Sequence, residues 1–340
     1  MGLFTNDPLQ IICFQSYGTH EHFYCRGRAL EDENIDLSRK GLGALLKNTW
    51  KRFETDEIPH AKLKITLPDE RVLYARSNAE GYFKMEEMVD NLDGLTNSEG
   101  WLPYEISYAT DFPGKVIQQQ NRFPGEMLIP SRSAAFGVIS DIDDTIIHTG
   151  VASTLKWRLI FNTFLKTAES RSPLEGASEF YHMLHRGHSG TEANPLFYVS
   201  NSPWNLYRYL EHFLKVHQFP KGPILLRDFR TMFDRTPKPE KPHKQHEIRN
   251  ILKTYPHLNF ILIGDAGEHD ADIYMEVAEE YPGRIKAIYL RSVKHKKKRI
   301  RIEGLFNEFK TVPALFVDSS KEAIEHAERS GFIAPGSSVQ

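Results

Sequence analysis

Cysteine is almost absent from this chain of 340 residues, which contains only Cys13 and Cys25 and no CxxC pair. Neither a disulfide framework nor a cysteine-based zinc site is indicated, so both thiols are expected to be reduced and structural. Long hydrophobic runs are absent as well. Stretches such as residues 260–263 fall far short of the roughly 18 apolar residues that a membrane helix requires, so the sequence predicts no transmembrane segment.

An excess of charge of either sign is also missing, because 43 Lys and Arg residues oppose 45 Asp and Glu residues and leave a net charge of −2. This balance argues against a protein that binds nucleic acid through bulk charge, so no nucleic-acid partner is expected. The densest basic run is interpreted either as a contact for anionic lipid or nucleic acid, or as a solvated face. It consists of Lys294, Lys296, Lys297, Lys298, Arg299 and Arg301.

The first residues contain no basic region followed by an apolar stretch, and Asn6 stands where a myristoylation signal has Ser or Thr. No secretory signal is recognised, and a cytoplasmic location is expected. Peripheral attachment to a membrane stays open as an addition to that location.

Residues 1–112 show the period-two alternation of apolar and polar residues that is typical of strands. The clearest segments are residues 63–67, 71–75, 82–85 and 104–108. Short strands at this spacing predict an antiparallel β-sandwich domain. Apolar residues at helical spacing also predict an amphipathic helix at 39–53, which either packs on the sandwich or faces a membrane.

Residues 113–133 lose this pattern and are rich in Pro, Gly and Gln, which predicts a linker. From 134 to 334, apolar strands alternate with helical patterns, as is typical of a doubly wound α/β domain with a buried parallel sheet. The expected strands cover 136–139, 196–199, 224–226, 260–263, 285–290 and 314–317. The expected helices cover 175–186, 204–216, 244–255 and 270–280, and a last helix is capped by Ser319 and Glu322. Residues 335–340 are expected to form a tail.

Acidic and hydroxyl residues follow three of the predicted parallel strands. Asp141 and Asp143 come after the first strand, Ser200 after the second and Asp265 after the fourth. The carboxyl ends of parallel strands meet at one edge of the sheet, where such folds bind ligands. Converging carboxylates repel each other unless a cation lies among them, and Mg²⁺ is the first candidate because it prefers oxygen ligands.

This set of residues fits phosphoryl transfer through an aspartyl-phosphate. Asp141 is the predicted nucleophile, and Asp143 is the predicted general acid, which then activates water as a base. Ser200 and a lysine are expected to hold the phosphoryl oxygens. Asp265 is expected to bind Mg²⁺ together with Asp141, and Asp270 to orient either a water on the metal or the lysine.

The identity of that lysine stays open, because Lys238, Lys241 and Lys244 all lie ahead of the helix that leads to the fourth strand. Lys244 is favoured, since it stands directly at the helix start. The fifteen histidines are scattered and form no metal-binding pair. His148 and His269 stand next to the acidic loops and are candidates for contact with a substrate.

The order Asp141-x-Asp143-x-Thr145, a Ser after a strand, a Lys at a helix start and Gly264-Asp265 resembles the four motifs of haloacid dehalogenase (HAD) superfamily phosphatases. More specifically, several segments resemble the Mg²⁺-dependent phosphatidate phosphatase family typified by the actin-patch protein. These segments are 136–146, 149–151, 198–204, 243–244 and 288–291, with 17–19 and 27–30 upstream. Residues 78–83 also resemble the turn of transthyretin-like sandwich modules, so the resemblance covers nearly the whole chain.

The resemblance implies a HAD-like fold with a minimal cap, preceded by the smaller sandwich domain. It implies hydrolysis of phosphatidate to diacylglycerol and phosphate, Mg²⁺ as the cofactor, and phosphatidate or another anionic lipid at a membrane surface as the partner. The catalytic residues by this resemblance are Asp141, Asp143, Thr145, Ser200 and Lys244, the metal ligands are Asp141, Asp143 and Asp265, and the substrate contacts are Ser200, Asn201, Lys244 and Asp270.

The gaps between the motifs are too short for a large cap domain, so an open site is expected, which suits a membrane-embedded substrate. The apolar residues of 155–164 are interpreted either as a flap that touches acyl chains or as a helix folded onto the core. Two other functions are considered. One is a HAD phosphatase that acts on a phosphoprotein or a nucleic-acid end, and the other is a binding or scaffold protein in which the acidic site is secondary.

Overall fold

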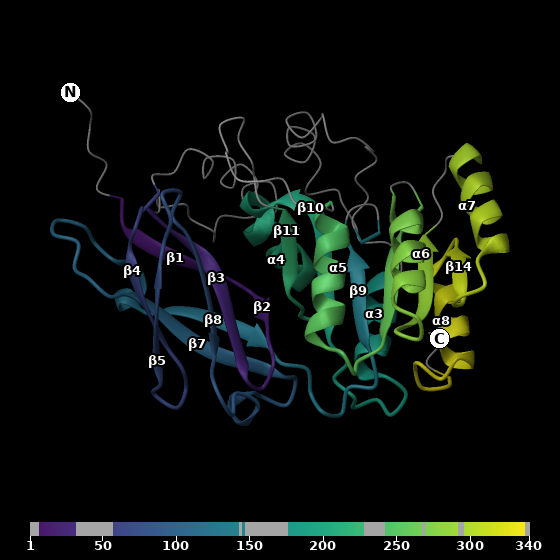
Figure 1. Cartoon of the computed structure of the whole chain (residues 1–340), viewed down its shortest axis with the longest axis horizontal. Helices are drawn as coiled ribbons and strands as arrows, with labels where there is room; N and C mark the ends of the chain where they lie inside the picture. Colours follow the sequence, from purple (N-terminus) through teal and green to yellow (C-terminus); the bar gives the residue numbers. More distant parts are fainter. Residues whose placement is uncertain are drawn as a thin grey trace. The chain divides into compact units, whose positions relative to one another are not determined.

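The computed structural model describes residues 7–31, 57–142, 145–146, 176–227, 242–266, 269–291 and 296–336. The chain divides into two compact units, Met1–Pro130 and Ser131–Gln340 (Figure 1). The predicted helix at 39–53 and the predicted flap at 155–164 lie outside the described residues. Within the described ranges, every helix is too short or too polar to cross a bilayer.

Unit 1 consists of two β-sheets. The first is antiparallel, in the order β1 (Leu9–Phe14), β3 (His22–Glu31) and β6 (Tyr82–Met88). The second has five strands in the order β2 (Ser16–Tyr17), β8 (Phe123–Leu128), β7 (Trp101–Tyr108), β4 (Lys62–Thr66) and β5 (Val72–Arg76). Short 3-10 helices lie at Asp93–Leu95 and Gln118–Asn121. The antiparallel pair β4–β5 confirms the prediction of antiparallel strands for the alternating segments 63–67 and 71–75.

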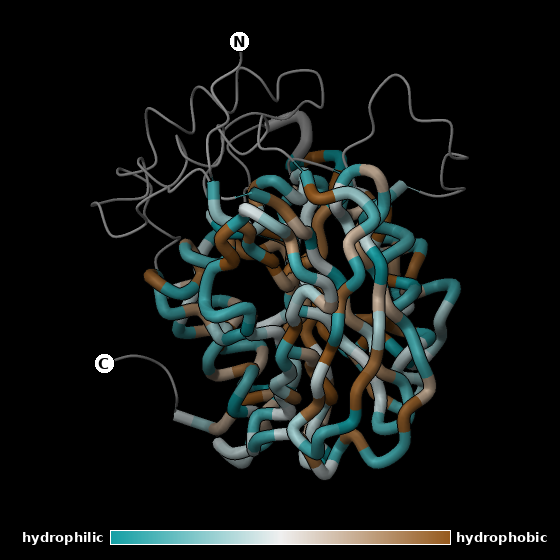
Figure 2. The backbone as a smooth tube through the Cα atoms, turned by 90° about the vertical axis from the view of Figure 1, so that its left-hand side faces the viewer, coloured by the Kyte–Doolittle hydropathy of each residue, from teal (hydrophilic) through white to brown (hydrophobic). Residues whose placement is uncertain are grey.

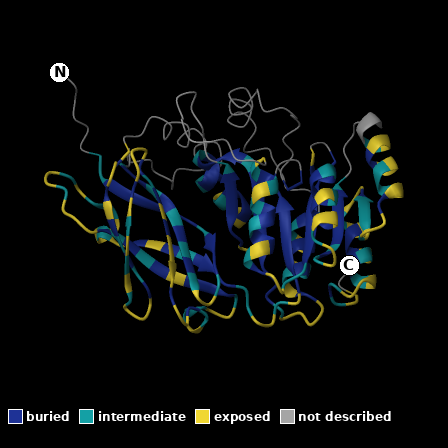
Figure 3. Cartoon of the chain, viewed as in Figure 1, coloured by how far each residue is buried: buried dark blue, intermediate teal, exposed yellow. Residues whose placement is uncertain are grey.

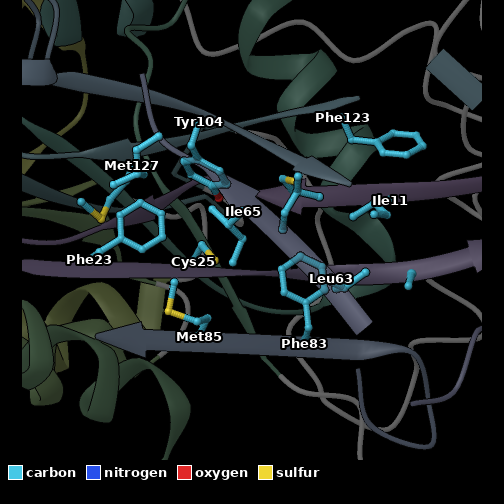
Figure 4. Close-up of a cluster of buried hydrophobic side chains, with 14 of the residues drawn as sticks. Ile11, Phe23, Cys25, Leu63, Ile65, Phe83, Met85, Tyr104, Phe123 and Met127 are labelled. Carbon is cyan, nitrogen blue, oxygen red and sulfur yellow. The ribbon is translucent and has the colours of Figure 1, made fainter. Parts of the chain in front are cut away.

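The core of unit 1 lies between these two sheets. Alternate residues of each strand point inward, and Figure 2 shows hydrophobic and hydrophilic residues alternating along the tube. Side chains from both sheets meet in the core, among them Phe23, Cys25, Ile65 and Tyr104 (Figure 4). Both cysteines are buried thiols, and burial raises the pKa of the Cys25 thiol well above its usual value.

Strand β8 lies within the segment 113–133 that the sequence predicts as a linker, so this part of the prediction is wrong. Pro124 and Gly125 suggested a loop, but both fit the strand for local reasons. Pro124 is exposed, and Gly125 packs against a ring, since a Cβ atom there would lie 2.1 Å from Cε2 of Tyr104. The glycine therefore allows close packing within the sheet rather than a turn.

Unit 2 is built around a parallel six-stranded sheet in the order β11-β10-β9-β12-β13-β14. Its strands are β9 (Gly137–Asp141), β10 (Leu196–Pro203), β11 (Ile224–Arg227), β12 (Phe260–Asp265), β13 (Ile285–Arg291) and β14 (Ala314–Val317). Its helices are α3 (Ala177–Arg186), α4 (Tyr207–Val216), α5 (His243–Thr254), α6 (Asp270–Glu280), α7 (Lys296–Glu308) and α8 (Ser320–Arg329), with a 3-10 turn at Trp204–Leu206. The predicted α/β architecture is confirmed, and the sequence did not predict α7.

Helices cover both faces of this sheet. Figure 1 shows α5 and α6 in front of the strands, whereas α3 and α8, which pack against each other, lie behind them. Figure 3 shows the strands buried and the outer sides of the helices exposed. From β9 the chain moves to β10 and β11 on one side, and it then returns to add β12, β13 and β14 on the other. The carboxyl end of β9 is therefore the topological switch point, where a doubly wound sheet binds its ligands.

Candidate active site

Three polar residues stand at the switch point of the sheet. Asp141 is the last residue of β9 and Asp265 the last residue of β12. Ser200 lies within β10, which continues to Pro203 instead of ending at the predicted residue 199, and it follows Val199, which pairs with Asp141 in the parallel register. All three side chains are buried. The predicted convergence of these residues at one edge of the sheet is therefore what the structure shows.

A cluster of buried carboxylates lies at this edge. Oxygen atoms of Asp141, Asp265 and Asp270 lie within 4.8 Å of one another, and the three residues are at most 1% exposed. The Nζ atom of Lys244 lies 2.8 Å from Oδ1 of Asp141 and 2.5 Å from Oδ1 of Asp270. Of the three candidate lysines, Lys244 thus lies in the site, and the other two are outside the described residues.

The first turns of two neighbouring helices provide Lys244 and Asp270. Lys244 is the second residue of α5, and Asp270 is the first residue of α6, where the helix dipole favours a carboxylate. Oδ2 of Asp270 also accepts a hydrogen bond of 3.3 Å from the backbone N–H of Asp265. Further along, Arg249 of α5 forms ion pairs with Glu276 and Glu280 of α6 and so joins the two helices.

Gly264 makes the close approach of Asp270 possible. A Cβ atom at this position would lie 2.5 Å from Oδ2 of Asp270 and 2.8 Å from Cε2 of Tyr274. Any larger residue would therefore displace the carboxylate or the ring. The sequence analysis named Gly264 only as part of a motif, and these distances show why a glycine stands there.

The remaining predicted site residues divide into those near the cluster and those that are not described. Oγ1 of Thr145 donates a hydrogen bond of 3.4 Å to Oδ2 of Asp141. Oγ of Ser200 accepts a hydrogen bond of 2.9 Å from the backbone N–H of Ser202, and Asn201 is partly buried beside it. Asp143 lies outside the described residues, as does His148.

The other candidate histidine does not belong to this buried cluster. The side chain of His269 is 91% exposed, and its Nδ1 atom lies 3.9 Å from Oδ2 of Asp272. The contact of His269 with a substrate stays a prediction.

Two buried tyrosines support the cluster, and the sequence patterns did not identify them. The Tyr181 hydroxyl lies 2.6 Å from Oγ of Ser140, next to Asp141 in β9. The Tyr274 hydroxyl donates to the backbone oxygen of Ile263 at 2.9 Å. Burial raises the pKa of both phenols, and the charge of Asp141 or Asp270 adds to the increase, so both stay neutral donors.

A small cavity of about 40 Å³ lies beside the cluster on the α3 and α8 side of the sheet. Its walls are mostly apolar, and Thr145, Tyr181 and Arg291 line it. Arg291 is the last residue of β13 and pairs in register with Asp265. Partial burial lowers the pKa of its guanidinium. The sequence singled out Arg291 only as part of a family pattern, without a role.

The donor set of the carboxylate cluster fits a divalent cation. Among the described residues of the cluster, three carboxylates against one ammonium leave a formal charge of −2. Uncompensated buried charge is costly, and carboxylate oxygens are the ligands that Mg²⁺ prefers. The sequence named Asp141, Asp143 and Asp265 as ligands, whereas the described oxygens that cluster are those of Asp141, Asp265 and Asp270. A metal site at this position is thus consistent with charge and chemistry.

Residues 296–301 of the basic run form the start of α7, and residues 294 and 295 lie outside the described ones. The two basic residues of this run with described side chains form ion pairs. Arg299 bonds to Glu303 and Asp318, and Arg301 to Asp272. These two cations are therefore partly neutralised by the protein itself.

Residues 136–292, which contain the carboxylate cluster, are similar to known proteins. Residues 136–292 match the family model described as phosphatidate phosphatase APP1, catalytic domain. The phosphatidate phosphatase APP1 of Saccharomyces cerevisiae is 32% identical over 244 residues, which are 70% of this chain and 39% of the yeast protein. An uncharacterized protein of Schizosaccharomyces pombe is 28% identical over 219 residues, which are 64% of this chain and 34% of that protein.

The chain thus spans little more than a third of the length of these two curated relatives. The matched segment 136–292 begins just before β9 and ends just after β13, so it contains Asp141, Ser200, Lys244 and Asp265. Through this segment, the chain belongs to the family of the phosphatidate phosphatase APP1 catalytic domain.

Proposed function

We propose that this chain is a Mg²⁺-dependent phosphatidate phosphatase that hydrolyses phosphatidate to diacylglycerol and phosphate. The observation that carries the proposal is the buried set of three carboxylates with Lys244 among them, at the switch point of a segment that matches this family. The name of the yeast relative supplies the substrate class. The chemistry of the cluster is suited to a phosphate ester, because it combines a nucleophilic carboxylate, a cation and a metal-binding set.

The first half of the reaction uses Asp141 as the nucleophile. A carboxylate oxygen of Asp141 attacks phosphorus, and the bond between phosphorus and the glycerol oxygen breaks. Asp143 gives its proton to the leaving alkoxide, which departs as diacylglycerol. Lys244 and the Ser200 hydroxyl hold the phosphoryl oxygens, and Thr145 keeps the Asp141 carboxylate in place through its hydrogen bond.

The second half regenerates the enzyme. Asp143, now a carboxylate, takes a proton from water, and the water oxygen attacks the phosphorus of the aspartyl-phosphate. The bond between phosphorus and the Asp141 oxygen then breaks and releases inorganic phosphate. Asp270 holds the Lys244 ammonium throughout, at 2.5 Å. When bound at Asp141 and Asp265, Mg²⁺ supplies positive charge that neutralises the phosphoryl oxygens.

We further propose that unit 2 is a HAD-like domain with a minimal cap and that it extends to residue 334, followed by a short tail. Unit 1 is then a sandwich domain that includes β8, and the connection between the domains is shorter than the sequence suggested. We propose a cytoplasmic protein that associates peripherally with membranes, since its substrate is a membrane lipid.

The substrate is tested by comparing phosphate release from four phosphate esters in the presence of Mg²⁺. These are phosphatidate in mixed micelles, p-nitrophenyl phosphate, a phosphopeptide and DNA with a 3′-phosphate. The proposal predicts that the rate with phosphatidate far exceeds the others. A preference for the peptide or the DNA would refute the lipid substrate but still support phosphatase chemistry. The absence of turnover with all four esters would favour the scaffold interpretation.

A further inference from the structure

The outward face of β4 and β5 in unit 1 combines positive charge with an exposed aromatic ring. Lys62 and Lys64 alternate along β4 with the buried residues Leu63 and Ile65. On β5, Val72, Tyr74 and Arg76 are all exposed, and Tyr74 reaches 67%. This pleated face therefore presents cations and a tyrosine to the outside. We refer to Lys62, Lys64, Tyr74 and Arg76 as the β4–β5 face.

The register of the hairpin brings these groups together. Lys62 lies directly opposite Arg76, and Lys64 directly opposite Tyr74. Like charges at directly opposite positions of a sheet repel each other, so the Lys62–Arg76 pair gains nothing for the stability of the hairpin. A repulsive pair on an exposed sheet is consistent with a binding role for an anion.

The cations of this face have no acidic partner among the described residues. Neither Lys62 nor Lys64 forms an ion pair in that part of the chain, and Arg76 donates only to the backbone oxygen of His60, at 3.1 Å. The outward face of the other sheet differs. There, Lys84 pairs with Glu86, and Arg28 pairs with Glu57. Among the described residues, the cations of the β4–β5 face thus differ from Lys84 and Arg28, whose charges are paired with carboxylates.

An anionic membrane is the occupant that this combination fits. The face is the outward side of two paired strands, so its side chains can contact an extended plane such as a bilayer surface. Lys and Arg side chains are attracted to anionic headgroups, and Tyr side chains are enriched at the level of the headgroups. A protein with a net charge of −2 needs such a local surface to approach an anionic bilayer.

We propose that the β4–β5 face docks the protein on membranes that contain anionic lipid, with Tyr74 entering the headgroup region. The choice of a membrane rather than an acidic protein rests on the proposed lipid substrate. Unit 1 thereby has a function of its own, which is to keep the chain at the surface where the substrate resides.

The test measures sedimentation of the full chain with phosphatidylcholine vesicles, with and without phosphatidylserine and without phosphatidate. Binding to the anionic vesicles should fall about a hundredfold in K62Q/K64Q/R76Q, which corresponds to about fivefold for each residue. It should also weaken with added salt in the wild type. Tyr74→Ser should weaken binding less than the triple substitution and change its salt dependence little.

The matched control is K215Q/K253Q/K310Q, which removes the same charge from exposed positions of unit 2. It should bind as the wild type does. Equal loss in both triple variants, or no loss in K62Q/K64Q/R76Q, would overturn the proposal. A wild type that does not distinguish the two vesicle types, or one whose β4–β5 face binds an acidic peptide but no vesicles, would also overturn it.

The failure of the proposed function has a different signature. Because the vesicles contain no substrate, binding is measured without turnover, and p-nitrophenyl phosphate hydrolysis reports the catalytic site separately. If the protein binds anionic vesicles but does not hydrolyse phosphatidate, the docking proposal is supported and only the proposed enzymatic function is refuted.

Discussion

From the carboxylate cluster we expect that Asp265→Asn, a substitution in the candidate site, stabilises the protein in the absence of metal. Asp265→Asn removes one of three buried negative charges but keeps the size and shape of the side chain. Without a divalent cation, the described part of the wild-type site holds Asp141, Asp265 and Asp270 against the ammonium of Lys244. The variant therefore relieves repulsion in the folded state that the unfolded chain does not experience.

The size of this effect depends on the separation of the oxygens. Two carboxylates at most 4.8 Å apart repel each other by at least about 3.5 kcal/mol at an effective dielectric constant of about 20. Asp265 has two such neighbours, and Lys244 offsets part of the repulsion. We expect the free energy of unfolding of Asp265→Asn in EDTA to exceed that of the wild type by about 1–3 kcal/mol.

In Mg²⁺, the free energy of unfolding of the wild type should exceed that of Asp265→Asn. At a Mg²⁺ concentration of about 100 times the dissociation constant, the wild type gains about 2.7 kcal/mol, whereas the variant loses most of that gain with its ligand. Urea unfolding in EDTA and in Mg²⁺ measures both effects. The control is Glu279→Gln, an exposed carboxylate on α6, which should change neither value. If the variant unfolds before the wild type in EDTA, or if Mg²⁺ stabilises both equally, carboxylate repulsion does not govern this cluster.

Three further predictions concern Lys244, Arg249 and His326. Lys244→Met leaves buried carboxylates without their ammonium, so urea unfolding should show a loss of about 3–5 kcal/mol, and adding Asp270→Asn should recover part of it. Arg249→Met loosens α5 from α6, so steady-state kinetics should show a larger fall in kcat than rise in KM, whereas Arg208→Met on α4 should leave kcat unchanged. Burial lowers the pKa of His326 below its usual 6.5, so the unfolded chain binds the proton more tightly and stability falls as the pH drops below about 6.5. Unfolding measured between about pH 7 and pH 5 should show a shallower decline for His326→Asn; an unchanged decline would exclude this histidine as its source.

Much of unit 2 could be predicted because its strands are short apolar runs bounded by polar residues. The run that ends at Ile263 placed Asp265 at the end of a strand, which the structure shows. The run that ends at Val199 was too short, because β10 continues to Pro203, but Ser200 still lies at the same edge since Val199 pairs with Asp141. Asp141 ends β9 after the buried Ser140. Periodicity and chain order were sufficient to find this edge, because a buried parallel strand is largely apolar.

Other features could not be read from patterns of single residues. Strand β8 contains Pro124 and Gly125, and the glycine fits there because the Tyr104 ring of a neighbouring strand packs against it. The inclusion of Asp270 in the oxygen cluster depends on where α6 begins relative to β12, and the absent side chain of Gly264 permits it. Likewise, the Arg249 ion pairs depend on how α5 packs on α6. These are tertiary contacts, and local sequence does not encode them.

The aspartyl-phosphate mechanism is tested most directly by looking for the phosphoryl group on Asp141. The wild type is mixed with phosphatidate and Mg²⁺, quenched in acid during turnover, digested, and the peptide that contains Asp141 is examined by mass spectrometry. We expect one added phosphoryl group on Asp141, absent with EDTA and absent in Asp141→Asn, which should also release no phosphate. Rapid phosphate release by Asp141→Asn, or a phosphoryl group found on another residue, would contradict this mechanism.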